Sequence, residues 1–121
     1  MKNKKSFLQV RDDLQNKKTT VRSITANYIK SIHDNKDLNI FIEVFEKEAL
    51  SRANEIDEKI KSKTHGKLAG MIIAIKDNLC YENHLVTASS KILKGFKSNY
   101  SATAIEKLLN EDAIIIGRVN C

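Results

Sequence analysis

A continuous apolar segment near the middle of the chain constrains the fold more than any other feature of the sequence. Five of the six residues from Met71 to Lys76 are apolar. Successive side chains of a strand point to opposite faces, so both faces of this segment are apolar. Such a strand is typical of the interior of an α/β sheet that helices cover on both sides. The segment therefore predicts an interior strand, which ends at the charged residues Lys76 and Asp77.

The chain before this segment has a helical pattern. Three groups of apolar residues recur there at spacings of three or four, which places each group on one face of a helix. These groups are Phe7, Val10 and Leu14; Val21, Ile24, Tyr28 and Ile32; and Ala49, Ala53, Ile56 and Ile60. They predict a short first helix, a second helix over residues 20–33 that Thr20 caps, and a third over about residues 44–61.

The sequence after the apolar segment predicts one more helix and one more strand. Ile105, Leu108 and Leu109 predict a helix, for which Ser101 is the expected N-cap. The apolar residues 113–116 then predict another strand. The order strand, loop, helix, strand indicates an α/β protein.

The predicted fold is therefore α/β, with N-terminal helices followed by strands that helices cover. A chain of 121 residues with 41% hydrophobic and 30% charged residues can bury one modest core. We expect a single domain and not two, with a helical segment over residues 1–65 and an α/β unit over residues 66–121.

The net charge of +6 is compatible with a nucleic-acid-binding function, because lysine and arginine neutralise phosphates. Basic residues cluster only in the first five residues, MKNKK, and at Lys61, Lys63 and Lys67. The chain has 17 lysines, 4 arginines and no proline, a bias that AT-rich codons explain as well as RNA binding does. A small basic RNA-binding module is therefore one alternative function.

The sequence does not predict a metal site or a disulfide. His33, His65 and His84 lack the spacing of metal ligands, so we interpret them as surface or structural residues. Cys80 and Cys121 lack a C-x-x-C spacing and are interpreted as free thiols. The start of the chain resembles neither a signal peptide nor a membrane span, which predicts a cytoplasmic protein with no membrane contact.

Two interpretations of Lys76 are open. As the end of a strand, it can extend its ammonium group into water, with Asp77 as a solvated neighbour. Alternatively, the apolar flank excludes water from the amine, and this favours the neutral form of a lysine and allows it to act as a base. The pattern of apolar residues alone favours the first interpretation.

The segment from Gly66 to Cys80, GKLAGMIIAIKDNLC, resembles the first signature of the amidase signature family, usually written G-P-L-A-G-I-P-I-A-I-K-D-N. The resemblance extends over nearly the whole chain. It includes residues 87–93, 101–103 and 114–120, and residues 38–42 and 48–53, which resemble the family's N-terminal helical segment. Within the family, the pieces Asp-Asn-Leu-Cys and Ser-Lys-Ile-Leu are most similar to the A subunits of glutamyl-tRNA(Gln) amidotransferases.

This resemblance implies an amidase that hydrolyses glutamine to release ammonia. Subunits B and C of a heterotrimer would use the ammonia to convert Glu-tRNA(Gln) into Gln-tRNA(Gln). ATP and Mg would be used by a partner subunit of this heterotrimer, and this chain would bind no cofactor. The family's mechanism uses a nucleophilic serine, a second serine in a cis peptide, and a lysine. Lys76 matches the catalytic lysine, and Asp77 and Asn78 of the same signature are expected to have supporting roles.

The family's two serines lie in a Gly-Gly-Ser-Ser-Gly-Gly-Ser segment, which these 121 residues do not contain. Ser89 and Ser90 match an ordinary stretch of the family pattern without flanking glycines, so they are assigned no catalytic role. The resemblance therefore implies that the chain is the N-terminal part of a single amidase domain. Its strands would be the first strands of a mixed sheet flanked by helices, and residues 66–121 would be the start of the α/β core. We expect such a chain to be inactive alone. A stand-alone amidase of the same family, which acts on another amide, is the second alternative.

The chain departs from the family pattern at four positions. Lys67 and Ile72 replace prolines, which removes two restraints on the backbone. Ser89 replaces a glycine, and Asp112 replaces the glycine that ends a helix. Aspartate adopts the left-handed conformation more readily than most residues, so we expect a positive φ at Asp112.

Overall fold

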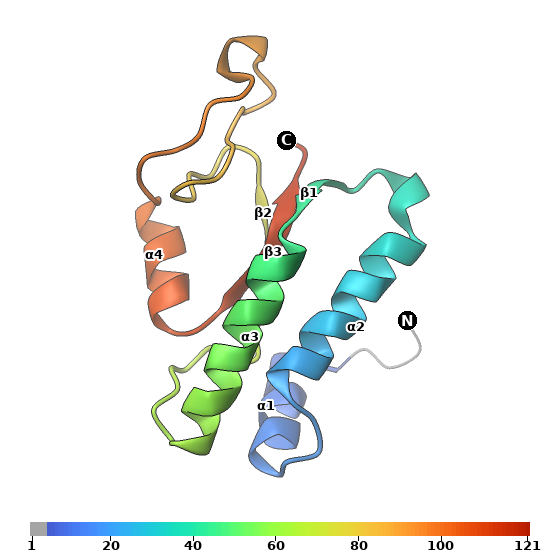
Figure 1. Cartoon of the computed structure of the whole chain (residues 1–121), viewed down its shortest axis with the longest axis vertical. Helices are drawn as coiled ribbons and strands as arrows, with labels where there is room; N and C mark the ends of the chain where they lie inside the picture. The colour runs from blue at the N-terminus through green and yellow to red at the C-terminus, as the bar shows by residue number, and fades with distance from the viewer. Residues whose placement is uncertain (1–4) are drawn as a thin grey trace.

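The computed structural model describes residues 5–121 (Figure 1). Residues 1–4, which hold most of the basic N-terminal group, lie outside the described part. The described residues form four α-helices, two short 3-10 helices and three strands. In chain order these elements are α1 Phe7–Gln15, α2 Val21–Asp34, η1 Lys36–Leu38, β1 Phe41–Val44, α3 Glu46–Lys61, β2 Ile72–Lys76, η2 Lys91–Leu93, α4 Thr103–Asn110 and β3 Ile114–Val119.

The three strands form one mixed sheet in the order β1-β3-β2. The middle strand, β3, pairs in parallel with β2 and antiparallel with β1. Residues 114–118 of β3 are all buried. The α/β class and both predicted strands are thereby confirmed.

The position of β2 in the sheet differs from the prediction. The sequence predicted an interior strand, but β2 lies at the edge of the described sheet and pairs only with β3. Ile75 is buried, whereas Ala74 and Lys76 on the opposite face are exposed. An apolar run indicates which residues can be buried. Which strand is central depends on pairing between distant segments, and a short-range pattern does not encode this.

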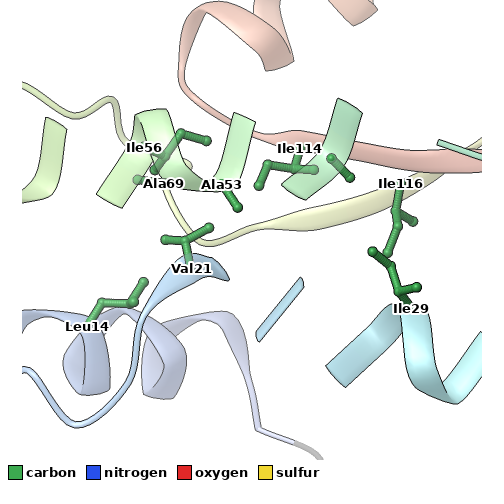
Figure 2. Packing of buried hydrophobic residues seen from close by; sticks show 9 residues of the cluster. Leu14, Val21, Ile29, Ala53, Ile56, Ala69, Ile114 and Ile116 are labelled. Carbon is green, nitrogen blue, oxygen red and sulfur yellow. The ribbon is translucent and has the colours of Figure 1, made fainter. Parts of the chain in front are cut away.

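Helices cover both faces of the sheet, with α1, α2 and α3 on one face and α4 on the other (Figure 1). Figure 2 shows the larger core cluster, in which Leu14 and Val21 lie at one end and Ile29 of α2 meets Ile116 of β3 at the other. The smaller cluster joins α4 to the opposite face of the sheet through Phe45, Ile75, Ile105 and Ile115. The sheet thus separates two hydrophobic clusters, one on each of its faces.

The start of α2 is fixed by two side chains. The Thr20 hydroxyl accepts a hydrogen bond from the Ser23 N–H at 3.1 Å, so the predicted cap is confirmed. The carboxylate of Asp57 in α3 accepts hydrogen bonds from the N–H groups of Val21 at 2.7 Å and Arg22 at 3.1 Å. A negative charge is favourable at a helix N-terminus, so Asp57 attaches the start of α2 to α3.

A strand that the sequence did not predict, β1, precedes α3. The third helix was predicted from about residue 44, but α3 begins at Glu46 because residues 41–44 pair with β3. Phe45 then donates its N–H to the Ile116 carbonyl oxygen at 2.8 Å. A strand of four residues is too short to show a clear alternation in the sequence, so its formation depends on the partner strand.

The helix predicted before the last strand is confirmed as α4, which buries Ile105. Its N-cap is Ala102 and not Ser101, so that prediction was wrong. The Ser101 hydroxyl instead accepts a hydrogen bond from the Glu82 N–H at 3.0 Å, and this bond ties the preceding loop to the start of α4.

Both cysteines are free thiols, as predicted. Within residues 5–121, none of the helices combines the length and the apolar character that crossing a bilayer requires.

Candidate active site

The residues predicted for the active site lie where β2 ends. Lys76 is the last residue of β2 and lies in register with Val119 of β3. The Asp77 N–H donates to the Val119 carbonyl oxygen at 2.9 Å, and the Leu79 N–H donates to the Lys76 carbonyl oxygen at 3.0 Å. These bonds close a turn around Asp77 and Asn78. The structure thus places the three residues together at the carboxyl end of parallel strands, the usual position of sites in α/β proteins.

Lys76 and Asn78 are exposed, whereas Asp77 is buried. Strand alternation places Lys76 on the same face of β2 as Ile72 and Ala74. The exposed amine agrees with the solvated interpretation of this lysine. Its catalytic role stays a prediction, and residues 5–121 do not provide the exclusion of water that this role requires.

The carboxylate of Asp77 is held by hydrogen bonds, and only 2% of the residue's surface is exposed. Its carboxylate accepts hydrogen bonds from the Thr87 N–H at 3.1 Å, from the Thr87 hydroxyl and from the Arg118 guanidinium. Burial alone would raise the pKa of Asp77, but the bonds from Thr87 and the bond and charge of Arg118 hold this pKa below its ordinary value. Asp77 is therefore an anion that ties the turn to the Thr87 loop and to β3.

Arg118 extends this network across the sheet. Its Nε donates to the Glu43 carboxylate at 3.1 Å, and its Nη1 donates to Asp77. These three charged residues join β1, β3 and the end of β2. Sequence reasoning missed Arg118 and Glu43, because 41 positions separate Arg118 from Asp77 and 75 separate it from Glu43. The available signal was an arginine two positions after the apolar residues 113–116, which is buried only if the strand continues past Gly117.

The loop after the turn approaches the end of β3. The Ala88 N–H donates to the Asp77 carbonyl oxygen at 2.9 Å, and the Ser89 hydroxyl donates to Asn120 Oδ1 at 3.1 Å. Ala88 and Ser89 both have positive φ, at 49° and 59°. The left-handed conformation explains why glycine suits the position of Ser89 in the family pattern. The absence of a catalytic role for Ser89 and Ser90 stays a prediction.

A second buried carboxylate, that of Asp112, fixes the segment that leads into β2. Asp112 has φ 71°, so the predicted left-handed conformation is confirmed. Its carboxylate accepts hydrogen bonds from the Lys59 ammonium at 2.8 Å and from the Gly66 N–H at 2.7 Å. Burial opposes ionisation, but these bonds and the charges of Lys59 and Arg52 hold the pKa of Asp112 below its ordinary value. The replacement of glycine therefore adds an anchor between α3, the end of α4 and the signature segment.

His84 has a structural role, as predicted. Its Nε2 lies 2.6 Å from the Glu48 carboxylate and its Nδ1 lies 2.7 Å from the Glu82 carbonyl oxygen. Its ring stacks on Tyr81 with centroids 3.8 Å apart. Burial, with a further contribution from the Glu48 charge, raises the pKa of Tyr81. Across residues 5–121, no group of three or more His, Cys, Asp or Glu side chains is arranged to hold a metal ion.

Comparison with known proteins identifies the family. Residues 23–121 match the model of the family described as Amidase, and this match covers most of the chain. The chain therefore belongs to the amidase family.

Within the family, the chain is similar to glutamyl-tRNA(Gln) amidotransferase A subunits. That of Brachyspira hyodysenteriae is 41% identical over 122 residues, which cover 98% of this chain and 25% of that protein. That of a Chlorobium phaeobacteroides strain is 42% identical over 116 residues, which cover 95% of this chain and 24% of that protein. The resemblance to the amidase family and to these A subunits is thereby confirmed. The chain spans about a quarter of the length of these relatives.

Solved structures of amidases have the same fold. A peptide amidase from Stenotrophomonas maltophilia superposes with a TM-score of 0.89 at 22% identity, over 97% of this chain and 25% of that one. A bacterial aryl acylamidase of the amidase signature family gives a TM-score of 0.83 at 21% identity, over 96% of this chain and 25% of that one. At these identities the likeness concerns the fold alone.

Proposed function

We propose that this chain supplies the catalytic lysine of a glutamine-hydrolysing subunit in a glutamyl-tRNA(Gln) amidotransferase. The proposal rests on the 41% identity to the Brachyspira hyodysenteriae subunit over 98% of the chain. The position of Lys76 supports it, because the lysine ends β2 beside a turn that the buried Asp77 holds in place.

In the proposed reaction, Lys76 acts as the base. A nucleophilic serine attacks the amide carbon of glutamine, and its proton passes through a bridging serine to the neutral amine of Lys76. The proton returns to the leaving nitrogen as ammonia departs, and water then hydrolyses the acyl-enzyme to glutamate. Both serines would come from polypeptide other than these 121 residues, so we expect this chain alone to be inactive.

Asp77 and Asn78 would support this reaction in different ways. Asp77 is held by Thr87 and Arg118, so it fixes the backbone that carries Lys76 without itself exchanging a proton. Asn78 is exposed at the tip of the turn, where its amide is free to bond to added polypeptide or to substrate.

The proposal includes the partners that the family resemblance implies. Subunits B and C would complete a cytoplasmic heterotrimer, and the released ammonia would convert Glu-tRNA(Gln) into Gln-tRNA(Gln). ATP and Mg would act in the partner subunit, and this chain would bind no cofactor.

A chimera tests the proposed role of Lys76. This chain would replace the matching quarter of the Brachyspira hyodysenteriae subunit, and ammonia release from glutamine would be measured with the B and C subunits of that organism. We expect activity in the chimera, no activity above background in the 121-residue chain, and loss of activity in the Lys76→Ala chimera. Lys94→Ala, which removes another exposed lysine, is the matched control. Turnover that survives Lys76→Ala would refute the proposal.

A stand-alone amidase of the same family is the second candidate, because the family model that matches residues 23–121 is described only as Amidase. The same chimera distinguishes the two functions. Hydrolysis of peptide amides without subunits B and C, in preference to glutamine, would favour the stand-alone enzyme.

A further inference from the structure

A basic groove lies at the opposite end of the molecule from the candidate active site. Two adjoining hollows of about 830 and 200 Å³ share Leu14, Gln15, Ile60 and His65 in their linings, so they form one continuous groove. The groove runs between the C-terminal parts of α1 and α3, which lie at the lower end of Figure 1, whereas β3 and the chain end in its upper part. A ligand in this groove would leave Lys76 uncovered.

The charged side chains of the groove are almost all basic. Four lysines, one arginine and one histidine line it, and all six residues are exposed: Arg11, Lys17, Lys61, Lys63, His65 and Lys67. Among the described residues that line it, the one acidic residue is Asp57, whose carboxylate already accepts hydrogen bonds from the N–H groups of Val21 and Arg22. The groove therefore has a positive potential that attracts anions.

Most of these basic side chains have no anionic partner in the part of the chain that the structure describes. Within residues 5–121, one of the six, Lys61, forms an ion pair. Its ammonium lies 3.3 Å from the Glu58 carboxylate, but these side chains are 75% and 74% exposed, so the pair contributes little. Glu111 lies beside Lys67, where its carboxylate accepts the backbone N–H at 2.9 Å. The remaining positive charges repel one another across the groove, and a bound polyanion would remove this repulsion.

The AT-rich codon bias of the sequence explains the number of lysines but not their arrangement. The helix macrodipole favours lysine in a last turn, which accounts for Lys61 of α3. Arg11 lies in the middle of α1 and Lys67 lies in the loop after α3, so both are outside such positions. The acidic residues Glu46 and Glu48 are in the first turn of α3, at the end that does not line the groove. The fold thus separates basic from acidic residues along α3 and gathers basic residues from several segments around one hollow.

The other groups in the groove indicate a phosphate backbone as the ligand. Gln15, Thr19 and Thr20 add an amide and two hydroxyls, which contact phosphate and sugar in protein–nucleic acid complexes, as lysine and arginine do. Among residues 5–121, no aromatic residue lines the groove, so it lacks the stacking surface on which unpaired bases are bound. Leu14 is buried and Ile60 is half-buried, so neither protrudes to enter a bilayer. These features favour a paired nucleic-acid helix over a single strand or a membrane.

We propose that this groove binds the backbone of double-helical RNA through phosphate contacts that do not depend on base sequence. Proteins that bind double-stranded RNA recognise its shape and its backbone in the same way. The choice of RNA rests on the proposed function, in which the substrate of the assembly is a tRNA, whereas the positive groove does not depend on that function. RNA held at this end of the chain would leave Lys76 open to glutamine.

Fluorescence anisotropy of a labelled RNA duplex of about 20 base pairs tests the inference without an activity assay. The duplex is titrated with the 121-residue chain and with the chimera, in 50 mM and in 200 mM potassium chloride. About four phosphate contacts should weaken binding roughly 100-fold between these salt concentrations, because each contact releases counterions. The double variant Lys17→Glu, Lys63→Glu loses two contacts. Its affinity at the lower salt concentration should fall at least about 10-fold, and its salt dependence should become shallower.

A second double variant provides the matched control. Lys91→Glu, Lys94→Glu makes the same change in net charge at two exposed lysines in the loop after β2, and it should change the affinity by less than about twofold. Lys17→Arg, Lys63→Arg keeps both charges and should bind as the wild type does. Circular dichroism melts measure whether each variant folds. If the glutamate variant of the groove does not fold, Lys17→Gln, Lys63→Gln removes the two charges without adding carboxylates and gives the same comparison.

Several results would overturn the inference. Absence of duplex binding by both the chain and the chimera would show that the groove does not take this ligand. Equal loss of affinity in the two glutamate double variants would show that binding follows net charge and not the groove. Equal binding of a DNA duplex would refute the choice of RNA, and tighter binding of poly-glutamate or of phosphatidylserine vesicles would identify another class of partner. A chimera that binds RNA through the groove but hydrolyses no glutamine would refute the proposed function and leave this inference intact.

Discussion

Removal of the Asp77 carboxylate should destabilise the fold more than any other single change in the candidate site. In Asp77→Ala, the Arg118 guanidinium stays buried with only the half-buried Glu43 as an anionic partner. The N–H and hydroxyl of Thr87 also lose their acceptor. Loss of one partner from a buried ion pair costs about 3–5 kcal/mol. The free energy of unfolding of a small domain is roughly 5–15 kcal/mol, so Asp77→Ala should remove a large part of it.

The other carboxylate bound to Arg118 provides the matched control. Glu43→Ala removes an interaction with the same guanidinium, but the Glu43 side chain is 42% exposed and Arg118 keeps Asp77. Exposed ion pairs contribute about 0–1 kcal/mol, so this variant should lose no more than that. The double variant Asp77→Ala, Arg118→Met should recover part of the loss, because no buried charge is left without a partner.

Urea unfolding followed by circular dichroism measures these differences, with the dependence on urea expected to stay the same in all variants. The pH dependence gives a second measurement. The pKa of Asp77 is lowered in the folded chain, so its stabilising effect is complete above the ordinary aspartate pKa of about 3.9 and is lost as the pH falls through the lower folded value. The difference between wild type and Asp77→Asn should therefore shrink in strong acid. A loss in Asp77→Ala no larger than that in Glu43→Ala would refute the reasoning.

Three further predictions concern the segments on either side of the site. Asp112→Asn should destabilise the chain at neutral pH and much less in strong acid, because hydrogen bonds from Lys59 and Gly66 lower the pKa of Asp112. Urea unfolding at several pH values measures this difference in stability. A loss of stability that is the same at every pH would contradict the prediction. Gly66→Ala should lower the free energy of unfolding by about 1–3 kcal/mol, because a Cβ there would lie 2.6 Å from the Glu111 carbonyl group. An unchanged midpoint of urea unfolding would show that the loop adjusts without this loss. Ser89→Gly should stabilise the chain by about 0.5–1 kcal/mol, because it relieves a left-handed conformation at φ 59°; a lower melting temperature would mean that the bond to Asn120 outweighs the strain.

The sequence predicted what depends on neighbouring residues. A pattern a few residues long is enough to predict the first three helices, the Thr20 cap and the left-handed conformation of Asp112. It failed where distant segments decide the outcome. The edge position of β2 and the strand β1 both follow from pairing with β3, and the Arg118 network joins residues up to 75 positions apart. The signature segment located Lys76, but the exposure of this residue depends on which elements cover its face of β2, and a short-range pattern does not encode this.

The bonds that hold the two ends of α2 differ in exposure, and this has a mechanical consequence. Thr20 and Asp57 hold its first turn, whereas the far end is joined to α3 through the exposed contact between His33 and Glu46. A helix of 14 residues is about 21 Å long, so a tilt of about 5° at the capped end displaces the opposite end by about 2 Å. A tilt of this size would part Ile29 from Ile116, which are buried in one cluster (Figure 2), so this packing holds the C-terminal end of α2 against the sheet.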